Sequence, residues 1–451
     1  GAHLGGTCPS MKRDDHSFQT DSMTATGSRR APVGLLLLIG LLLFAPLIEG
    51  GTTHVAVMVI RLTLLICLAW TVVTQARLGR LTLPNPATAP AVLAFLGLAL
   101  VSTLISPYPH QSAQWMTVLA TYAISLYLLV SYFSAWEHVR MVCAVLVLMA
   151  TVEAGWGMSQ QVWGGALRPS GTFFNPNFLA GYLVAMAVFV AGVVSVRRAR
   201  RVPWGWAGSA MLATVLAGAA LATGSRGAVL ALAAGAILVL GLRHRLKGVA
   251  AVLALHGCVA LLPNPVSERL RAEHRANPLS YARIQVWMGA MKDLLDHPMG
   301  IGLGLYQYVY PLHPAAIEGQ ITRYGRTAQN AHNEYLQIGV EVGVLGLIVF
   351  LWGVAALGCE ARSLLRRRLR RLHRGVIIGA SGGVTTILVH AMVDANLHEP
   401  ALAMLLACLA AVILSARQWA THDPYEACGL SITAPRWRLV TSCAGVGLVC
   451  V

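Results

Sequence analysis

Charged residues are scarce in this chain. Asp, Glu, Lys and Arg make up only 12% of the 451 residues, against roughly 25% in soluble domains. Hydrophobic residues make up 56%, and the mean hydropathy is +0.63. This composition excludes an ordinary soluble enzyme and predicts a polytopic membrane protein.

Acidic residues and patterned cysteines are also lacking. The chain has 18 Asp and Glu against 34 Lys and Arg, and it shows no acidic metal triad and no glycine-rich nucleotide loop after a strand. The sequence therefore predicts no metal and no cofactor. The nine cysteines lie mostly inside apolar runs and show neither a disulfide framework nor metal-ligand spacing.

The long apolar runs define the expected fold. A helix needs roughly 20 apolar residues to cross a bilayer. We predict an all-α polytopic protein with about 12 transmembrane helices, at 31–49, 53–74, 89–106, 112–135, 138–163, 176–196, 204–222, 226–242, 246–263, 331–358, 374–394 and 399–420. No small-residue cleavage site follows the first run, so we expect its helix to stay uncleaved.

The basic residues predict the orientation of these helices. Most of the 34 Lys and Arg fall in alternate loops, including a dense cluster from Arg362 to Arg374, while the outer turns 49–53, 107–111 and 395–398 have none. The positive-inside rule then places both termini in the cytoplasm. Such short clusters between apolar runs are typical of membrane loops, so the net charge of +16 does not predict nucleic-acid binding.

This topology divides the chain into five parts. Residues 1–30 are expected to be a disordered cytoplasmic tail or a cloning remnant, 31–263 transmembrane helices 1–9, and 264–330 one large outer loop. Residues 331–420 follow as helices 10–12, and 421–451 as a cytoplasmic tail whose apolar part, 437–451, is expected to lie on or partly in the membrane.

The large outer loop contains an amphipathic pattern. From Ser280 to His297, apolar side chains recur at helical spacing, at Ile284, Trp287, Met291, Leu294 and Leu295. This pattern predicts a helix lying on the membrane surface. Pro298 ends the pattern, and Gly300, Gly302 and Gly304 predict a flexible turn that is at most a weak phosphate-binding signal.

Several arginines lie in outer segments where the topology does not require them. Arg168 and Arg226 each stand alone in a short outer turn, and Arg283 lies in the amphipathic helix. A guanidinium binds phosphate through paired, charge-assisted hydrogen bonds. Arg226 also opens a helix, where free backbone amides attract anions. These arginines predict a phosphate site; a solvated loop or an arginine reaching back to water is the alternative.

His332 stands where the outer loop turns back into a helix. Histidine titrates near neutral pH and can act as a general base or acid. Glu334, two residues on, is expected to orient the site or to serve as the base itself. A structural histidine at a helix start is the alternative.

Charged residues inside the helices need partners. Arg61, Glu153 and Glu341 lie at similar depths below the outer ends of their segments. We predict that Arg61 forms a buried salt bridge with one of the two glutamates; a proton relay is the alternative.

Several of these motifs resemble one family, the O-antigen ligase and polymerase superfamily of bacterial inner-membrane glycosyltransferases. His332-Asn333 followed after nine residues by Gly343-Val-Leu-Gly346 resembles its H-N-x9-G-x-x-G signature. Further similarity lies in four other stretches between about Arg168 and Gly346: Ser225-Arg226-Gly227, Arg283 to Trp287, Pro298 to Gly304 and Asn175-Pro-Asn177.

The resemblance implies an activity. Such ligases move an O-antigen polysaccharide from undecaprenyl diphosphate to a sugar of lipid A–core, on the periplasmic side of the inner membrane. They belong to the GT-C-like class, invert the anomeric carbon, and use no metal or nucleotide.

The resemblance also implies roles for individual residues. Arg226, Arg283 and Arg168 would bind the diphosphate, and His332 would take the proton of the acceptor hydroxyl. Asn333 and Glu334 would orient His332 or the sugars. The supporting residues are Asn175, Asn177 and Ser225. A cavity in the membrane would hold the polyprenyl chain, partly covered by the amphipathic helix.

Other functions remain open at this stage. An O-antigen polymerase would use the same type of donor with a second such lipid as acceptor. Oligosaccharyltransferases that modify protein tend to carry additional C-terminal sequence that is not visible here. A polyprenyl-linked glycan transporter would suit twelve helices, but the two halves show no repeat and transport does not require the long basic loop. A scaffold would not explain the outer arginines.

Overall fold

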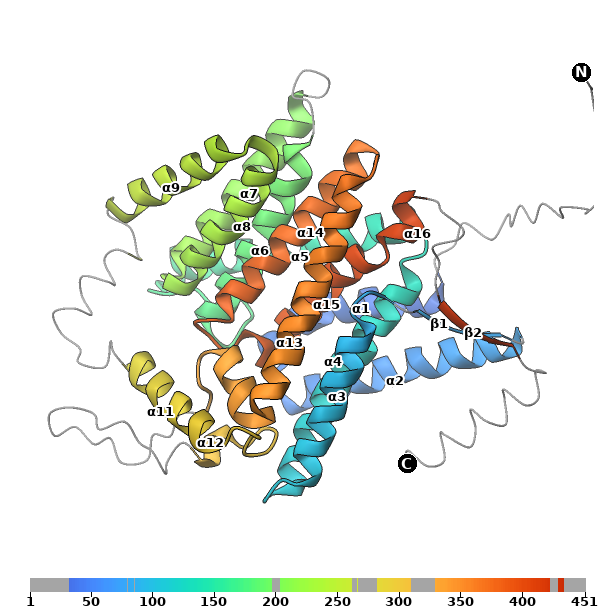
Figure 1. The fold of residues 1–451 in the computed structure, drawn as a ribbon. Coiled ribbons are helices and arrows are strands. Elements are labelled where there is room, and N and C mark those ends of the chain that lie inside the picture. Colours follow the sequence, from blue (N-terminus) through green and yellow to red (C-terminus); the bar gives the residue numbers. More distant parts are fainter. Residues whose placement is uncertain are drawn as a thin grey trace, which may run out of the picture. The chain divides into compact units, whose positions relative to one another are not determined.

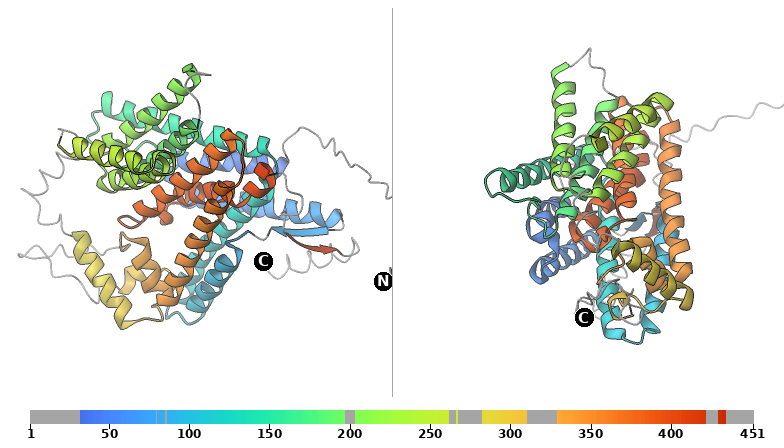
Figure 2. Two further views of the ribbon diagram at one scale, coloured as in Figure 1. Left: turned by 45° about the horizontal axis from the view of Figure 1, so that its top comes forward. Right: turned by 90° about the vertical axis from the view of Figure 1, so that its left-hand side faces the viewer.

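A computed structural model of the chain describes residues 32–78, 80–84, 86–196, 203–261, 266, 282–309, 329–421 and 429–433. Its elements are almost all helical (Figures 1 and 2). In chain order they are α1 (Val33–Leu47), η1 (Glu49–Gly51), α2 (His54–Arg77), β1 (Arg80–Pro84), α3 (Ala89–Leu104), α4 (Pro109–Tyr132), α5 (Trp136–Val162), α6 (Pro176–Ser195), α7 (Pro203–Ala222), α8 (Arg226–His244), α9 (Leu246–Leu261), α11 (Ala282–Asp296), α12 (Tyr306–Val309), α13 (Glu334–Arg366), α14 (Arg371–His390), η4 (Asn396–His398), α15 (Pro400–Leu414), α16 (Ala416–Thr421) and β2 (Gly429–Thr433).

Each of the twelve apolar segments coincides with a helix. Within the described residues, seven helices are long and apolar enough to cross a membrane, namely α2, α4, α5, α6, α8, α13 and α14, and four apolar helices are shorter. One of the shorter helices is α1, whose 15 residues span about 22 Å, less than a hydrocarbon core of roughly 30 Å. The structure confirms a polytopic helical membrane protein, while the count of twelve crossings stays a prediction.

Helices α6 and α14 form the centre of the bundle. Within their apolar windows, 83% of α6 and 72% of α14 are buried, against 22–39% in the other five long helices. They approach closely where Gly192 of α6 meets Gly379 of α14, since a Cβ on Gly192 would lie 2.3 Å from the Gly379 Cα. Small residues at such crossings let membrane helices pack backbone to backbone.

A two-stranded antiparallel sheet departs from the all-α prediction. β1 pairs with β2 in the register Arg80↔Thr433 to Pro84↔Gly429. The first strand lies between α2 and α3, and the second lies in the predicted C-terminal tail. Helical periodicity cannot reveal this pairing because its two strands are about 350 residues apart in the sequence. The sheet holds the tail and the α2–α3 connection at the same end of the bundle.

Helix α13 begins later than predicted and is broken once. The predicted segment opens at residue 331, but α13 starts at Glu334 because the Asn333 side chain caps it, accepting hydrogen bonds from the Tyr335 and Leu336 amides at 3.1 Å. Gly343 interrupts the helix with φ 88° and ψ 172°, a conformation that is open to glycine and strained for other residues.

The glycine-rich turn after α11 packs into this break. The Ile301 amide donates to the Val340 carbonyl at 2.9 Å, and the Val344 amide donates to the Pro298 carbonyl at 3.0 Å. A Cβ on Gly300 would lie 2.7 Å from the Glu341 carbonyl oxygen. The predicted flexible turn is therefore a fixed one, and its glycines permit close backbone contact with α13.

The predicted amphipathic helix is confirmed as α11, with a different orientation of its faces. Val286, Ala290 and Leu294 are buried against a cluster that includes Tyr306 and Val340. Leu294 is one of the apolar positions from which the amphipathic pattern was inferred, but its side chain is buried in the protein. Other parts of the outer loop and of the terminal tails, including 1–30, 267–281, 310–328 and 434–451, lie outside the described residues.

Candidate active site around Asp394

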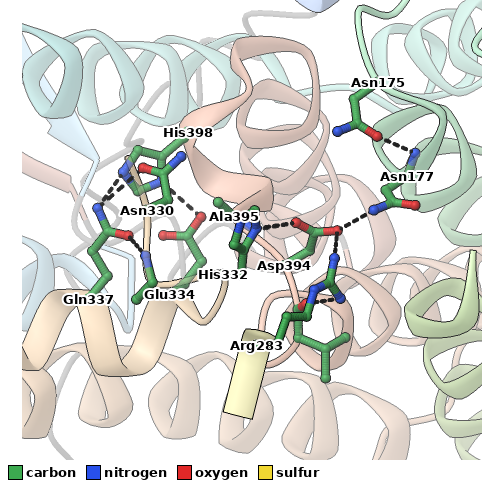
Figure 3. A network of polar contacts seen from close by, with 12 residues as sticks. Asn175, Asn177, Arg283, Asn330, His332, Glu334, Gln337, Asp394, Ala395 and His398 are labelled. Carbon is green, nitrogen blue, oxygen red and sulfur yellow. Dashed lines mark hydrogen bonds and ion pairs between the residues drawn. The ribbon is translucent and has the colours of Figure 1, made fainter. Parts of the chain in front are cut away.

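A buried carboxylate joins segments from three parts of the chain. Helix α14 ends at His390, and Asp394 lies in the turn that follows, only 2% exposed. Its Oδ1 lies 3.1 Å from His332 Nδ1, and its Oδ2 accepts hydrogen bonds from Arg283 Nη2 at 3.1 Å and Asn177 Nδ2 at 2.8 Å (Figure 3). His332 precedes α13, Arg283 lies on α11, and Asn177 lies on α6.

These contacts keep Asp394 ionised. Burial alone would raise the pKa of Asp394, but the hydrogen bond from His332 and the positive charge of Arg283 outweigh burial and hold the pKa below its ordinary value. A carboxylate in this state can accept a hydrogen bond from an imidazole N–H and stabilise the imidazolium that forms when the ring takes up a proton.

His332 has a strained backbone conformation, and its ring is partly exposed. Its φ is +50°, in the left-handed region that non-glycine residues seldom occupy. Neighbouring contacts hold it there: the Ala331 amide donates to Gln337 Oε1 at 3.0 Å, and the Glu334 amide donates to the Ala391 carbonyl at 2.9 Å. The His332 side chain is 42% exposed. With Nδ1 facing Asp394, Nε2 is available to a substrate.

The side chains of Asn333 and Glu334 contact described residues other than His332. The Asn333 side chain caps α13. Glu334 Oε1 accepts hydrogen bonds from the Leu397 amide at 2.7 Å and lies 3.0 Å from His398 Nδ1. The first turn of α13 directs both side chains to these partners, and Asp394 is the carboxylate that contacts the His332 ring. A role of Asn333 and Glu334 in orienting the sugars stays a prediction.

Glu334 belongs to a second polar group, with Gln337, Glu341 and His398. Figure 3 shows Glu334, Gln337 and His398 grouped apart from Asp394 and its partners. Gln337 Nε2 lies 3.0 Å from Glu341 Oε1 and 3.1 Å from His398 Nε2. Burial would lower the pKa of His398, but the charges of Glu334 and Glu341 and the hydrogen bond with Glu334 raise it. Protonation of Nε2 would require the Gln337 amide to turn its oxygen toward the ring.

Arg168 links two of the predicted outer loops. Its Nε donates to the Thr223 carbonyl at 2.8 Å, and its Nη2 donates to Asn177 Oδ1 at 2.7 Å. Asn175 Oδ1 caps α6 by accepting from the Asn177 amide at 2.9 Å. Arg168 thus reaches Asp394 through Asn177, and Asp394 in turn binds Arg283.

Arg226 is the first residue of α8, as predicted. Ser225 caps this helix, accepting a hydrogen bond from the Ala228 amide at 3.4 Å. Gly227 lies against the segment that carries Asp394, since a Cβ on it would lie 2.8 Å from Val393 Cγ2 and 2.8 Å from His390 Cδ2. The amino end of α8 and its half-buried arginine therefore lie next to the Asp394 turn.

Comparison with protein families bears on the same residues. Residues 212–351 match the family described as O-antigen ligase. The match covers less than half of the 451 residues. The resemblance drawn from the motifs is confirmed by this match, and it supports a glycosyltransferase role with a lipid-linked polysaccharide donor and a lipid acceptor in general. A comparison with curated proteins finds no match.

The region matched to the O-antigen ligase family holds only part of the site. It includes Arg226, Arg283 and His332, whereas Asn177 and Asp394 lie outside it. Asp394 and His398 were not expected from the sequence. The available signal was the dense set of ionisable side chains from His390 to Glu399 in an otherwise apolar region, because such residues at membrane depth are costly.

The predicted salt bridge of Arg61 is wrong. Glu153 accepts hydrogen bonds from the Thr172 amide at 3.0 Å and from its hydroxyl at 2.5 Å. Glu341 accepts from the Gly304 amide at 2.8 Å and from Gln337. Among the described residues, Arg61 makes no ion pair with either glutamate. Similar depth in the membrane did not bring these side chains together, because the loops that follow Trp163 and Pro298 satisfy both carboxylates.

A cavity of about 300 Å³ adjoins the second polar group. It lies among α3, α4, α13 and α15, and its walls are largely apolar. Glu334, Gln337, Glu341 and His398 line one end, and side chains such as Phe95, Leu119, Phe350 and Leu406 line the rest. An apolar cavity with a polar end suits a hydrocarbon chain attached to a polar group.

Proposed function

We propose that this chain is an O-antigen ligase, which transfers an O-antigen polysaccharide from undecaprenyl diphosphate to a sugar hydroxyl of lipid A–core. The reaction inverts the anomeric carbon, uses arginines in place of a metal, and takes place on the periplasmic side of the bacterial inner membrane, in a GT-C-like fold with both termini in the cytoplasm. The family match and the bundle of apolar helices support this proposal.

One observation carries the proposal: Asp394 holds a histidine and an arginine at the same carboxylate. His332 Nδ1 and Arg283 Nη2 both lie 3.1 Å from Asp394 oxygens. A sugar transfer from a diphosphate needs a base beside the acceptor hydroxyl and positive charge beside the leaving group. Because His332 and Arg283 bind the same carboxylate, the distance between the base and the positive charge is fixed.

His332 acts as the general base. Its Nε2 accepts the proton of the acceptor hydroxyl as that oxygen forms a bond to the anomeric carbon from the face opposite the diphosphate. The imidazolium that forms is stabilised by ionised Asp394 through Nδ1–H. Because Asp394 receives hydrogen bonds from Asn177 and Arg283 as well, the ring is oriented before substrate binds.

The arginines stabilise the leaving diphosphate. As the anomeric carbon–oxygen bond breaks, its electron pair passes to the diphosphate, and guanidinium groups held in place lower the energy of that charge. Arg283 is fixed by Asp394 and by the Val393 carbonyl, to which Nη1 donates at 2.6 Å, and its side chain is 36% exposed. Arg226 adds charge at the amino end of α8. Arg168 mainly positions Asn177.

A reconstituted transfer assay tests this function. Purified protein in vesicles receives undecaprenyl diphosphate-linked O-antigen with either lipid A–core or a second donor molecule as acceptor. We expect product on lipid A–core from wild type, a loss of at least about 10²-fold in His332→Ala, and a strong loss in Arg283→Ala that Arg283→Lys only partly restores.

The two acceptors and the variants separate the alternatives. Polymerised donor without product on lipid A–core would make the chain a polymerase. No transfer to either acceptor would contradict the proposed enzyme activity and would favour a polyprenyl-linked glycan transporter. Full activity of His332→Ala with loss in Glu334→Gln would move the base to Glu334.

A further inference from the structure

Helix α11 has an apolar face that no described part of the protein covers. Ile284, Met288, Met291 and Leu295 are 52%, 68%, 44% and 72% exposed, and Met299, just beyond the helix, is 79% exposed. At about 100° per residue, the four helical positions fall within about 60° of one another. They form a single stripe, which we call the α11 stripe (Ile284, Met288, Met291 and Leu295).

The remaining surface of α11 has two other sectors. Val286, Ala290 and Leu294 are buried against the start of α13 and the segment around Tyr306. Lys292, exposed, lies about 70° from the centre of the stripe and on the side away from this packed face. A helix with one face on protein, one apolar face and one charged face fits the boundary between water, lipid and protein.

The packed face of α11 lies beside a predicted membrane span. Leu294 of α11 and Leu347 of α13 both lie within 4 Å of a Cβ placed on Gly339, at 3.3 and 3.7 Å. Leu347 belongs to the long apolar helix α13, whose Leu345 and Ile348 are each 55% exposed on its outside. Lipid that surrounds α13 therefore lies within reach of α11.

We propose that the α11 stripe is a lipid-docking surface, which seats α11 in the interfacial layer of the bilayer. The flexible methionine side chains adapt to an uneven surface and so can bury there without a fixed partner. Lys292 points its ammonium to the lipid headgroups while its methylenes follow the apolar face. The inference depends on the membrane-spanning fold and does not require the proposed transfer reaction.

This docking has a consequence for the Asp394 site. Arg283 lies on α11, one residue before the stripe begins, and binds Asp394 and the Val393 carbonyl. The lipid surface would thus fix the helix that carries this guanidinium, and the phosphate of any lipid-linked substrate would meet Arg283 at the depth of the headgroups.

Photo-crosslinking in vesicles tests the proposal. A benzophenone amino acid replaces Met288, Leu295, Lys292 or Leu345, one at a time, in full-length protein reconstituted into equal parts of phosphatidylethanolamine and phosphatidylglycerol that carry a radiolabel. All four side chains are exposed, so the substitutions leave the core intact. Leu345 is the lipid-facing reference and Lys292 the headgroup-facing control.

We expect crosslinks to labelled lipid at Met288 and Leu295 that approach the yield at Leu345 and exceed the yield at Lys292 several-fold. Yields at Met288 and Leu295 no higher than at Lys292 would overturn the proposal. So would crosslinks from these positions to another segment of the same chain or to a second copy, because either would show that protein covers the stripe.

Discussion

Asp394 is the residue on which the proposed chemistry depends most. Its two oxygens bind His332 on one side and Arg283 and Asn177 on the other, so its charge serves both the base and the phosphate-binding arginine. Asparagine fills the same space as aspartate but carries no charge. Asp394→Asn therefore tests the role of the charge without changing the packing.

We expect Asp394→Asn to reduce kcat for transfer by roughly 10²- to 10⁴-fold, because the amide no longer stabilises the imidazolium and favours the wrong tautomer of His332. Glu334→Gln should reduce kcat far less, since Glu334 contacts His398 and not His332. Transfer rates in vesicles, with melting temperatures as a folding check, measure both. Wild-type kcat in Asp394→Asn would remove Asp394 from the mechanism.

His398 should make stability depend on pH. Its pKa in the folded protein is raised above the ordinary 6.5, so protonation favours folding. The contribution is fully present below about pH 6.5 and is lost as pH rises through the raised pKa. We expect Tm to fall by a few degrees on going from pH 6 to pH 9, and this fall to be smaller in His398→Gln.

Glu334→Gln should also flatten this pH dependence, because it removes the carboxylate that raises the pKa of His398. An exchange of the exposed His54 for Gln is the matched control and should leave the dependence unchanged. Equal pH dependence in wild type and His398→Gln would show that another group controls it.

Among the elements, α13 sets the geometry of the site through its two irregular points. Asn333, directly after His332, caps the helix and decides that it begins at Glu334. The break at Gly343 makes room for the Pro298–Gly304 turn, whose Gly304 amide binds Glu341. The cap depends on the Asn333 side chain, whereas the break depends on backbone conformation and should respond to a substitution that adds only one methyl group.

We expect Gly343→Ala to destabilise the protein by roughly 2 kcal/mol or more, since its φ is +88° and the new Cβ would lie 2.7 Å from the Met299 carbonyl carbon. Gly358→Ala in the same helix is the control: nothing lies within 4 Å of its Cβ, so it should be neutral or stabilise by up to about 1 kcal/mol. Thermal melting in detergent compares them; equal Tm shifts would contradict the role given to the break.

In the molecule as a whole, the turns at alternate ends of the helices make two separate sets of contacts. One set meets at Asp394 and includes the Arg168–Thr223 contact. The other includes the β1–β2 sheet and the Arg417–Glu360 ion pair, with Nε–Oε1 at 2.6 Å. A chain that crosses a membrane repeatedly has its turns on alternate sides, and the two separate sets of contacts agree with such a path. The basic residues predict that the second set faces the cytoplasm.

Labelling from each side of the membrane tests that orientation. A cysteine in place of Leu167, which is 92% exposed, should react with an impermeant maleimide applied to the periplasmic face. A cysteine in place of Arg368, exposed between α13 and α14, should react only after the membrane is opened, and unsubstituted protein measures the background. The reverse pattern would invert the proposed topology.

Composition and periodicity determined the helical membrane fold, because burying a helix in lipid requires a long apolar run that is visible residue by residue. Local motifs likewise predicted the start of α8 at Arg226, the helix α11 and the family match that includes His332, since capping and amphipathic patterns act over a few residues.

The partners of the polar side chains were decided by packing. Asp394 lies 62 residues from His332 and 217 from Asn177, and no periodicity links such distant positions. The same limit explains the wrong pairing of Arg61 and the unforeseen β1–β2 sheet. Glu334 was the nearer carboxylate in sequence, but the Asn333 cap starts a helix that turns it toward His398, whereas the turn after α14 brings Asp394 to the His332 ring.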